Sequence, residues 1–222
     1  MRVDIWSDVV CPWCYVGKRR FETALAAFDG NDDVEVVHHS FQLNPTAPRG
    51  QTSDRREMLM QKYRLSPQQV DEMDARMTET AAAEGLEYHL DGTRSGNTFD
   101  AHQLLQLAKT RGVQDAVVER LYRAYFTEQR SIFDRESLVA LAVEAGLDAA
   151  DVGAALEQNH YAGAVEQDID MARQLGANGV PFFVIDRRFG VSGAQPPAVF
   201  LEVLTRAVTD AGPASDGPGG KV

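Results

Sequence analysis

The sequence is poor in cysteine. It holds two among 222 residues, Cys11 and Cys14, and only Pro12 and Trp13 stand between them. So few cysteines exclude a small scaffold stapled by several disulfides. A disulfide in so short a ring constrains the unfolded chain very little, so stabilisation is a weak reason to place the two thiols together. Three interpretations are open: a redox dithiol, half of a zinc site, or two buried cysteines that happen to be neighbours.

The chain is also short of positive charge and of long apolar runs. Its 22 basic residues stand against 33 acidic ones, giving a formal net charge of −11, and no stretch gathers the basic residues into a phosphate-binding face. We therefore expect no nucleic-acid partner. No apolar run is long enough for a membrane span, and the segment that begins at Met1 has none typical of an export signal. The sequence predicts a cytoplasmic protein without a membrane partner.

Residues that could complete a metal site are scattered. A zinc site built on Cys11 and Cys14 needs a second pair of ligands, and no further cysteine exists. His38 and His39 are adjacent on a predicted strand, so their side chains point to opposite faces and cannot both reach one metal. The other histidines are His89, His102 and His160. We therefore expect no metal and no other resident cofactor, with the histidines at the surface or partly buried.

The first forty residues have the pattern of an α/β unit. Residues 3–7 alternate between apolar and polar side chains, which is typical of a short strand. Pro12 suits the first turn of a helix, whose apolar stripe ends near Gly30. Residues 34–41 are β-branched and alternating, and so predict a second strand. Because a helix separates the two strands, they should be parallel in a βαβ unit.

From residue 52 to residue 160 the signals are those of helices only. Ser66 precedes a proline and a glutamine that together predict a helix N-terminus. Asn97, Asp134 and Asp148 are predicted to cap later helices, each closed by a glycine or polar segment. This stretch is therefore predicted to be an all-helical insertion in the α/β fold.

The α/β pattern returns after the insertion. A helix is predicted over residues 161–175, and it is followed by a buried strand in "VPFFVID", a weaker strand in "FGVSG" and a last helix. The order is therefore βαβ, a large all-helical insertion, and αββα. We predict an α/β domain from residues 1–51 and 161–211, an insertion domain over residues 52–160, and a disordered tail over residues 212–222.

The spacing of the cysteines favours redox chemistry. Residues three apart on a helix lie on one face with Cβ atoms about 5–6 Å apart, so Cys11 and Cys14 could open and close a disulfide with little movement. Cys11 is predicted at the helix N-terminus, where free backbone N–H groups and the helix dipole favour its thiolate. Cys14, one turn further on, should be shielded and protonated. Cys11 would then attack a partner sulfur, and Cys14 would resolve the mixed disulfide.

A second candidate element is the pair Val180-Pro181. A proline at the start of a buried strand cannot donate to a ladder, so it belongs at an edge or in a special turn. In the cis form it would present the backbone of Val180 as a short edge that could bind an extended chain. In the trans form it would merely begin a strand, and the residues alone leave both forms open.

These motifs together resemble a known family. The segments "IWSDVVCPWCYVGKRRFE", "SFQLNP", "GNTFDAHQLLQLA" and "GVPFFVI" resemble the DsbA family of thioredoxin-fold oxidoreductases, and in particular its cytoplasmic FrnE-like branch. The resemblance covers nearly everything except the tail. It implies a thioredoxin fold, a cis-proline loop at Val180-Pro181 packed against the disulfide, and an exposed nucleophile at Cys11. The substrate would lie against Pro12, Trp13, Val180 and Pro181, and the implied activity is dithiol-disulfide exchange with protein or peptide thiols.

The chain also departs from this pattern. Trp13 stands where the best-known members have histidine, which predicts a less oxidising pair. A sister branch, the kappa-class glutathione transferases and 2-hydroxychromene-2-carboxylate isomerases, typically has serine in place of Cys11 and a Ser-Asp pair for glutathione. Residues 191–195, "VSGAQ", lack that aspartate, so glutathione is the second candidate partner. A peptide-binding holdase is the third alternative, and the chain is expected to be a monomer or a homodimer.

Overall fold

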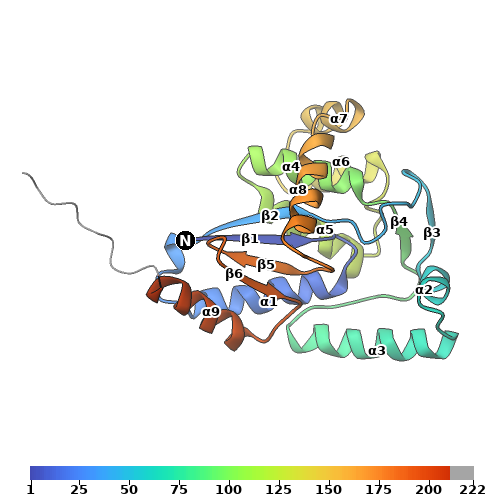
Figure 1. The fold of residues 1–222 in the computed structure, drawn as a ribbon. Coiled ribbons are helices and arrows are strands. Elements are labelled where there is room, and N and C mark those ends of the chain that lie inside the picture. The colour runs from blue at the N-terminus through green and yellow to red at the C-terminus, as the bar shows by residue number, and fades with distance from the viewer. Residues whose placement is uncertain (211–222) are drawn as a thin grey trace, which may run out of the picture.

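Four strands form the main sheet of the computed structural model, which describes residues 1–210. They are β1 (Arg2–Ser7), β2 (Glu35–Ser40), β5 (Phe182–Ile185) and β6 (Phe189–Ser192). The strand order is β2-β1-β5-β6 (Figure 1). β1 runs parallel to β2, as the βαβ pattern predicts, and antiparallel to β5, which pairs antiparallel with β6. The predicted tail over residues 212–222 lies outside the described residues.

Helices cover both faces of this sheet. α1 (Pro12–Ala26) and α9 (Pro197–Thr209) lie side by side on one face, and α8 (Ala162–Gln174) lies on the other (Figure 1). Three buried phenylalanines, Phe21, Phe183 and Phe200, meet between α1, α9 and the sheet with ring centroids 4.6 to 5.7 Å apart. Each such side chain contributes about 1.5–3 kcal/mol by its burial. This core holds the N-terminal and C-terminal parts of the chain together.

The segment between these parts is mainly helical. Its helices are α2 (Arg55–Tyr63), α3 (Pro67–Ala83), α4 (Phe99–Thr110), α5 (Gln114–Phe126), α6 (Arg135–Glu144) and α7 (Ala149–Glu157). It also contains β3 (Thr52–Asp54), which pairs antiparallel with β4 (Arg94–Gly96). The prediction of helices alone missed this ladder because strands of three residues are too short to show alternation. Whether residues 52–160 form a domain of their own stays a prediction.

The helix caps explain which helices the sequence predicts. Ser66 and Gln69 form the expected reciprocal capping box, and the Asp134 and Asp148 side chains accept backbone N–H groups at their helix starts. The prediction that Asn97 caps α4 was one residue out, because Thr98 is the capping residue and Asn97 accepts the N–H of Phe99 at 2.8 Å. α5 has no side-chain cap, so the sequence carried no sign of its start.

A buried histidine joins the helical segment to the sheet. His39 on β2 bonds Asp168 of α8 through Nδ1 at 2.6 Å and Asp4 of β1 through Nε2 at 2.7 Å, while Trp6 stacks on its ring at 4.4 Å. Gln106 of α4 donates to the same Asp168 carboxylate at 2.6 Å. Burial opposes the charge of His39, but its two carboxylate partners outweigh burial and raise its pKa. β1, β2, α4 and α8 thus share one buried ion cluster.

Three of the five histidines are more deeply buried than the sequence predicts, whereas His89 and His160 lie at the surface as expected. The exposed fractions are 4% for His38, 5% for His39 and 0% for His102. His38 and His39 do point to opposite faces, since His38 pairs with Asp115 of α5 at 3.2 Å and His39 with the cluster on the other side. A single sequence could not show these carboxylate partners, which lie 77 and 129 residues away.

This arrangement is the thioredoxin fold: a βαβ unit and an αββα unit with a helical insertion between them. None of the described helices combines the length and the apolar character that a membrane crossing requires.

Candidate active site

The two cysteines lie where α1 leaves the sheet. Cys11 is the N-cap of α1, and Pro12 is its first residue. The Cys11 N–H donates to the Asp8 carbonyl at 2.9 Å, and the Cys14 N–H donates to the Cys11 carbonyl at 3.0 Å. The Tyr88 hydroxyl donates to the Pro12 carbonyl at 2.8 Å and so fixes the first turn from the insertion side. No side chain caps this helix, so the positive end of its dipole faces Cys11.

Both thiols are free and buried, but they differ in their surroundings. Cys11 is only 4% exposed, so the expectation that its sulfur is exposed was wrong. It nevertheless lines an open groove of about 620 Å³, which Cys14 does not line. Burial raises the pKa of the Cys14 thiol well above its usual value, and its hydrogen bond with the Cys11 thiol adds to this effect. Cys14 is therefore a protonated thiol held behind Cys11.

The Val180-Pro181 pair lies beside Cys11, although 169 residues separate them in the chain. The peptide bond is cis, as the family resemblance implies. The Val180 carbonyl accepts the Cys11 thiol with a sulfur-to-oxygen distance of 3.7 Å, and Val180 lines the groove. Pro181 is buried beneath it, and its carbonyl accepts the Gly193 N–H at 2.8 Å. Because the ladder between β1 and β5 begins at Phe182, the backbone of Val180 lies outside the sheet pairing.

Gly17 sets how closely the proline loop approaches α1. A Cβ atom at Gly17 would lie 2.9 Å from Pro181 Cγ and 3.4 Å from Ala194 Cβ. No sequence signal marked this glycine, since it sits in mid-helix three residues after Cys14. The lack of a side chain at Gly17 therefore lets the loop that carries Val180 pack against the helix that carries both cysteines.

We expect Gly17→Ala to destabilise the protein and to slow any reaction of Cys11 that uses the proline loop. Overpacking costs about 1–3 kcal/mol. Alanine's better helix propensity offsets about 1 kcal/mol of that cost. Urea unfolding should therefore show a net loss of up to about 2 kcal/mol. The matched control is Gly153→Ala in α7, where an added Cβ meets nothing within 4 Å, so stability should rise. Equal effects of the two variants would contradict the close approach.

Two buried titratable groups lie at the floor of the site. Asp8 and His102 are both 0% exposed, with Asp8 Oδ1 3.4 Å from His102 Nε2. The pair is too poorly aligned for a hydrogen bond, so these two atoms have no partner among residues 1–210. Asp8 Oδ2 accepts the Leu43 N–H at 2.8 Å. Asp8 also lines the groove. The sequence indicated only a turn residue at this position.

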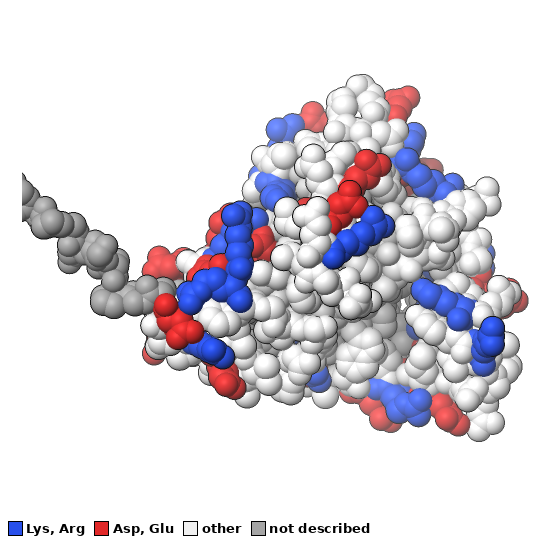
Figure 2. Space-filling view, viewed as in Figure 1, with Lys and Arg blue, Asp and Glu red and all other residues white. Residues whose placement is uncertain are grey.

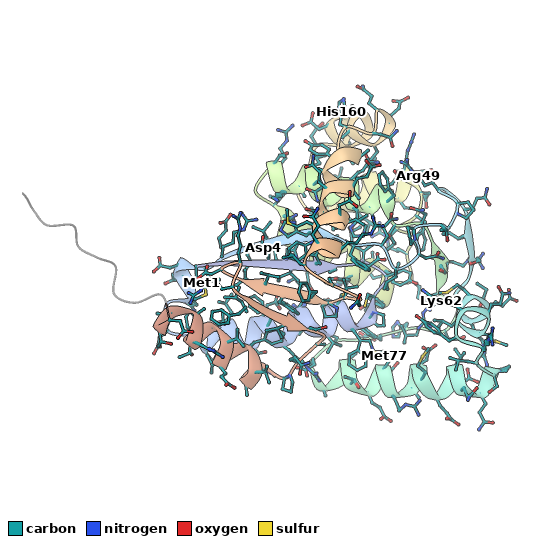
Figure 3. All side chains as sticks on the ribbon, in the orientation of Figure 1. Met1, Asp4, Arg49, Lys62, Met77 and His160 are labelled. Carbon is teal, nitrogen blue, oxygen red and sulfur yellow. The ribbon has the colours of Figure 1, made fainter. Side chains whose placement is uncertain are left out.

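The insertion supplies the second wall of the groove. Met58 and Leu59 come from α2, and Met73 and Met77 come from α3. These four residues form what we call the methionine wall. In Figure 3 the labelled Met77 lies on α3 and Lys62 on α2, the two helices at the lower right of the view. Of the six site residues predicted from sequence, four line this groove and two, Cys14 and Pro181, lie behind it. The four are Cys11, Pro12, Trp13 and Val180. Sequence reasoning missed the methionine wall because α2 carried no recognised signal, and because nothing in the residues of α3 indicated that Met73 and Met77 line a groove with Cys11.

Comparisons with known proteins agree with the fold. The DSBA-like thioredoxin domain family matches residues 2–205. A solved structure of a probable DsbA oxidoreductase from Streptomyces coelicolor is 49% identical, with a TM-score of 0.91, and the match covers 100% of this chain and 94% of that one. The uncharacterized protein YwbO of Bacillus subtilis is 28% identical over 215 residues, which are 95% of this chain and 96% of YwbO.

A more distant structure shares the fold. The cytosolic disulfide reductase DsbM from Pseudomonas aeruginosa, solved with GSH, has a TM-score of 0.65 at 19% identity, covering 94% of this chain and 100% of DsbM. The family match spans most of the chain, and the fold agrees with it. The protein therefore belongs to the DSBA-like thioredoxin domain family of thiol oxidoreductases.

Proposed function

We propose that the protein exchanges a dithiol for a disulfide with protein or peptide thiols through Cys11 and Cys14. One observation carries the proposal: Cys11 stands at the N-terminus of α1, at the end of an open groove, with its sulfur 3.7 Å from the Val180 carbonyl. A sulfur in that position is reachable by a chain in the groove. Cys14, protonated behind it, is held for the second step.

The exchange takes two steps and needs no reactant besides the two cysteines and the substrate disulfide. The Cys11 thiolate attacks one sulfur of a substrate disulfide, and the other substrate sulfur leaves as a thiolate. Cys14 then loses its proton and attacks the Cys11 sulfur, which releases the second substrate thiolate and leaves a Cys11-Cys14 disulfide. The dithiol is oxidised by two electrons, and the substrate disulfide is reduced. We assign Asp8 as acceptor of the Cys14 proton, because Asp8 is fully buried, its Oδ1 has no hydrogen-bond partner within residues 1–210, and it interacts with the Cys14 thiol.

We also propose that the protein is of the FrnE-like branch and that it acts as a reductase or isomerase. The CPWC motif and the segments quoted above support a FrnE-like protein that acts in the cytoplasm. A cytosolic glutathione poise of about −220 to −320 mV holds a mildly oxidising pair reduced. Under that poise, reduction or isomerisation of substrate disulfides is favoured over net oxidation.

We expect the reduced protein to reduce one equivalent of a peptide disulfide and to become oxidised between Cys11 and Cys14. The measurement is chromatography of the released peptide thiol, with mass mapping of the protein disulfide. The same assay with glutathione disulfide tests the glutathione-dependent alternative. That alternative requires glutathione disulfide to be reduced clearly faster than the peptide disulfide. A protein that binds the peptide and leaves its disulfide intact would overturn exchange in favour of the holdase alternative.

A further inference from the structure

The groove beside Cys11 has an apolar wall that adapts to its occupant. Leu59 and Met77 are 8% and 5% exposed, so they form a fixed base, whereas Met58 and Met73 are partly exposed above it. Methionine is unbranched and polarizable, so such a wall fits apolar side chains of differing shape. Trp13, 46% exposed, stands on the opposite side next to Cys11. The wall therefore favours apolar residues with little discrimination among them.

Five charged groups line the groove, and two of them, Arg55 and Asp74, form an ion pair with each other. Arg55 donates two hydrogen bonds to Asp74, at 2.8 and 2.9 Å, so this pair neutralises itself. Asp8 is fully buried at the floor and does not face solvent. The exposed charges left along the groove are those of Lys62 and Arg76, and both are positive.

Lys62 and Arg76 are free to meet an anionic partner. The Lys62 ammonium donates to the Leu43 carbonyl at 3.2 Å and forms no ion pair within residues 1–210. Among the described residues, Arg76, whose side chain is 71% exposed, pairs only with Glu72, at 4.0 Å. Figure 2 shows Lys and Arg side chains over α2, next to a hollow in the surface. In a chain with a formal net charge of −11, this groove is a local positive area.

We propose that the groove selects an extended peptide segment in which the disulfide cysteine is flanked by apolar residues and by an Asp or Glu side chain. The proposal rests on the exchange function proposed above and names its substrate class. The cysteine lies at Cys11 beside the backbone of Val180, the apolar residues lie on the methionine wall, and the carboxylate lies at Lys62 and Arg76. The adaptable wall accepts many apolar sequences, and charge supplies the selection.

Binding tests the groove without any exchange. Two peptides of identical apolar sequence, with serine in place of cysteine and either Glu or Lys as flanking residues, are titrated against the reduced protein. Trp13 fluorescence reports occupancy, since Trp13 lines the groove and Trp6 is 1% exposed. We expect the Glu peptide to bind about tenfold more tightly, which corresponds to about 1.4 kcal/mol. Added salt should reduce the preference, because both cations are exposed.

Charge reversal then tests whether Lys62 and Arg76 cause the preference for the Glu peptide. Lys62→Glu with Arg76→Glu should reverse the preference toward the Lys peptide. The matched control is Lys109→Glu with Arg123→Glu, which makes the same change in net charge at exposed residues outside the groove and should keep the preference. The corresponding peptide disulfides should show the same order in exchange rate. The rate with 2-hydroxyethyl disulfide, which is small and uncharged, should stay unchanged in the Lys109→Glu, Arg123→Glu control.

The outcomes separate this inference from the proposed function. If 2-hydroxyethyl disulfide is reduced but the Glu and Lys peptides bind equally, the selection by charge is overturned and exchange stands. If the Glu peptide binds more tightly but no disulfide is reduced, exchange fails and the charge selection holds for a binding protein. If the control variant also reverses the preference, the selection belongs to the overall charge, and the assignment to Lys62 and Arg76 is overturned. Self-association of the protein that blocks both peptides would identify a second copy as the occupant and overturn the proposal.

Discussion

We expect Cys14→Ser protein to accumulate as a mixed disulfide with a peptide substrate, and Cys11→Ser protein to form none. The reason is the order of the two sulfurs: Cys11 lines the groove, and Cys14 lies behind it as a protonated thiol. Without Cys14 the first attack occurs and cannot be resolved. Without Cys11 the exchange rate should fall by roughly three orders of magnitude or more, because a serine hydroxyl is not ionised at neutral pH.

Mass spectrometry of the intact protein measures this directly. The Cys14→Ser protein should gain the mass of one peptide, and digestion should place the peptide on Cys11. The Cys11→Ser, Cys14→Ser double variant is the baseline for peptide binding alone. Exchange that persists in Cys11→Ser, or a peptide trapped on Cys14, would contradict the assigned order.

The second large effect is expected at the buried ion cluster. His39→Ala removes the cation shared by Asp4 and Asp168, which are 4% and 7% exposed. Arg2 still pairs with Asp4 at 2.6 Å, so Asp168 is the carboxylate left without a cationic partner within residues 1–210. Breaking a buried pair in this way costs about 3–5 kcal/mol, because a buried charge is left without compensation. Urea unfolding should show this loss. His89→Ala, at a half-exposed histidine on the surface, should stay within about 0.5 kcal/mol of the wild type.

The contribution of the cluster depends on pH in a defined direction. The raised pKa of His39 means that its contribution is complete below its ordinary value of 6.5 and is lost as the pH rises through the folded value. For Asp4 and Asp168, burial opposes ionisation, but it is outweighed by His39 together with Arg2 at Asp4, and by His39 together with Ser40 and Gln106 at Asp168, so both pKa values are lowered from 3.8. Their contribution is present above that value and is lost as the pH falls.

The difference in unfolding free energy between wild type and His39→Ala should therefore be largest between about pH 4 and pH 6.5. Above that range it should shrink as the folded His39 loses its proton. A difference that grows steadily toward alkaline pH would contradict a charged His39 between two carboxylates.

The local features of the site could be predicted from the sequence. Cys11 and Cys14 lie within one turn, and Pro12 marks the start of their helix, so their placement at the end of a strand follows from short-range rules. The family resemblance added that Val180 and Pro181 come next to them, and the structure places Val180 against the Cys11 sulfur. Residues alone could not have brought together segments so far apart in the chain.

The long-range features could not be predicted. In the sequence Asp8 has the pattern of a turn residue. In the structure it is fully buried, and His102 of α4 lies 3.4 Å from it. In the sequence Gly17 is an ordinary mid-helix glycine, and only the structure shows that Pro181 packs against it. His39 has no visible partner in the sequence because Asp168 comes from the other side of the insertion. Each depends on tertiary packing, which local propensity and periodicity do not record.

Limited alkylation of the reduced wild-type protein tests the central claim most directly. With less than one equivalent of iodoacetamide at pH 7, the thiol that is ionised and open to the groove reacts first. We predict a carbamidomethyl group on Cys11 alone, with Cys14 unmodified until the protein is unfolded. Modification of Cys14 first, or of both cysteines at the same rate, would contradict an outer nucleophile backed by a protonated inner thiol.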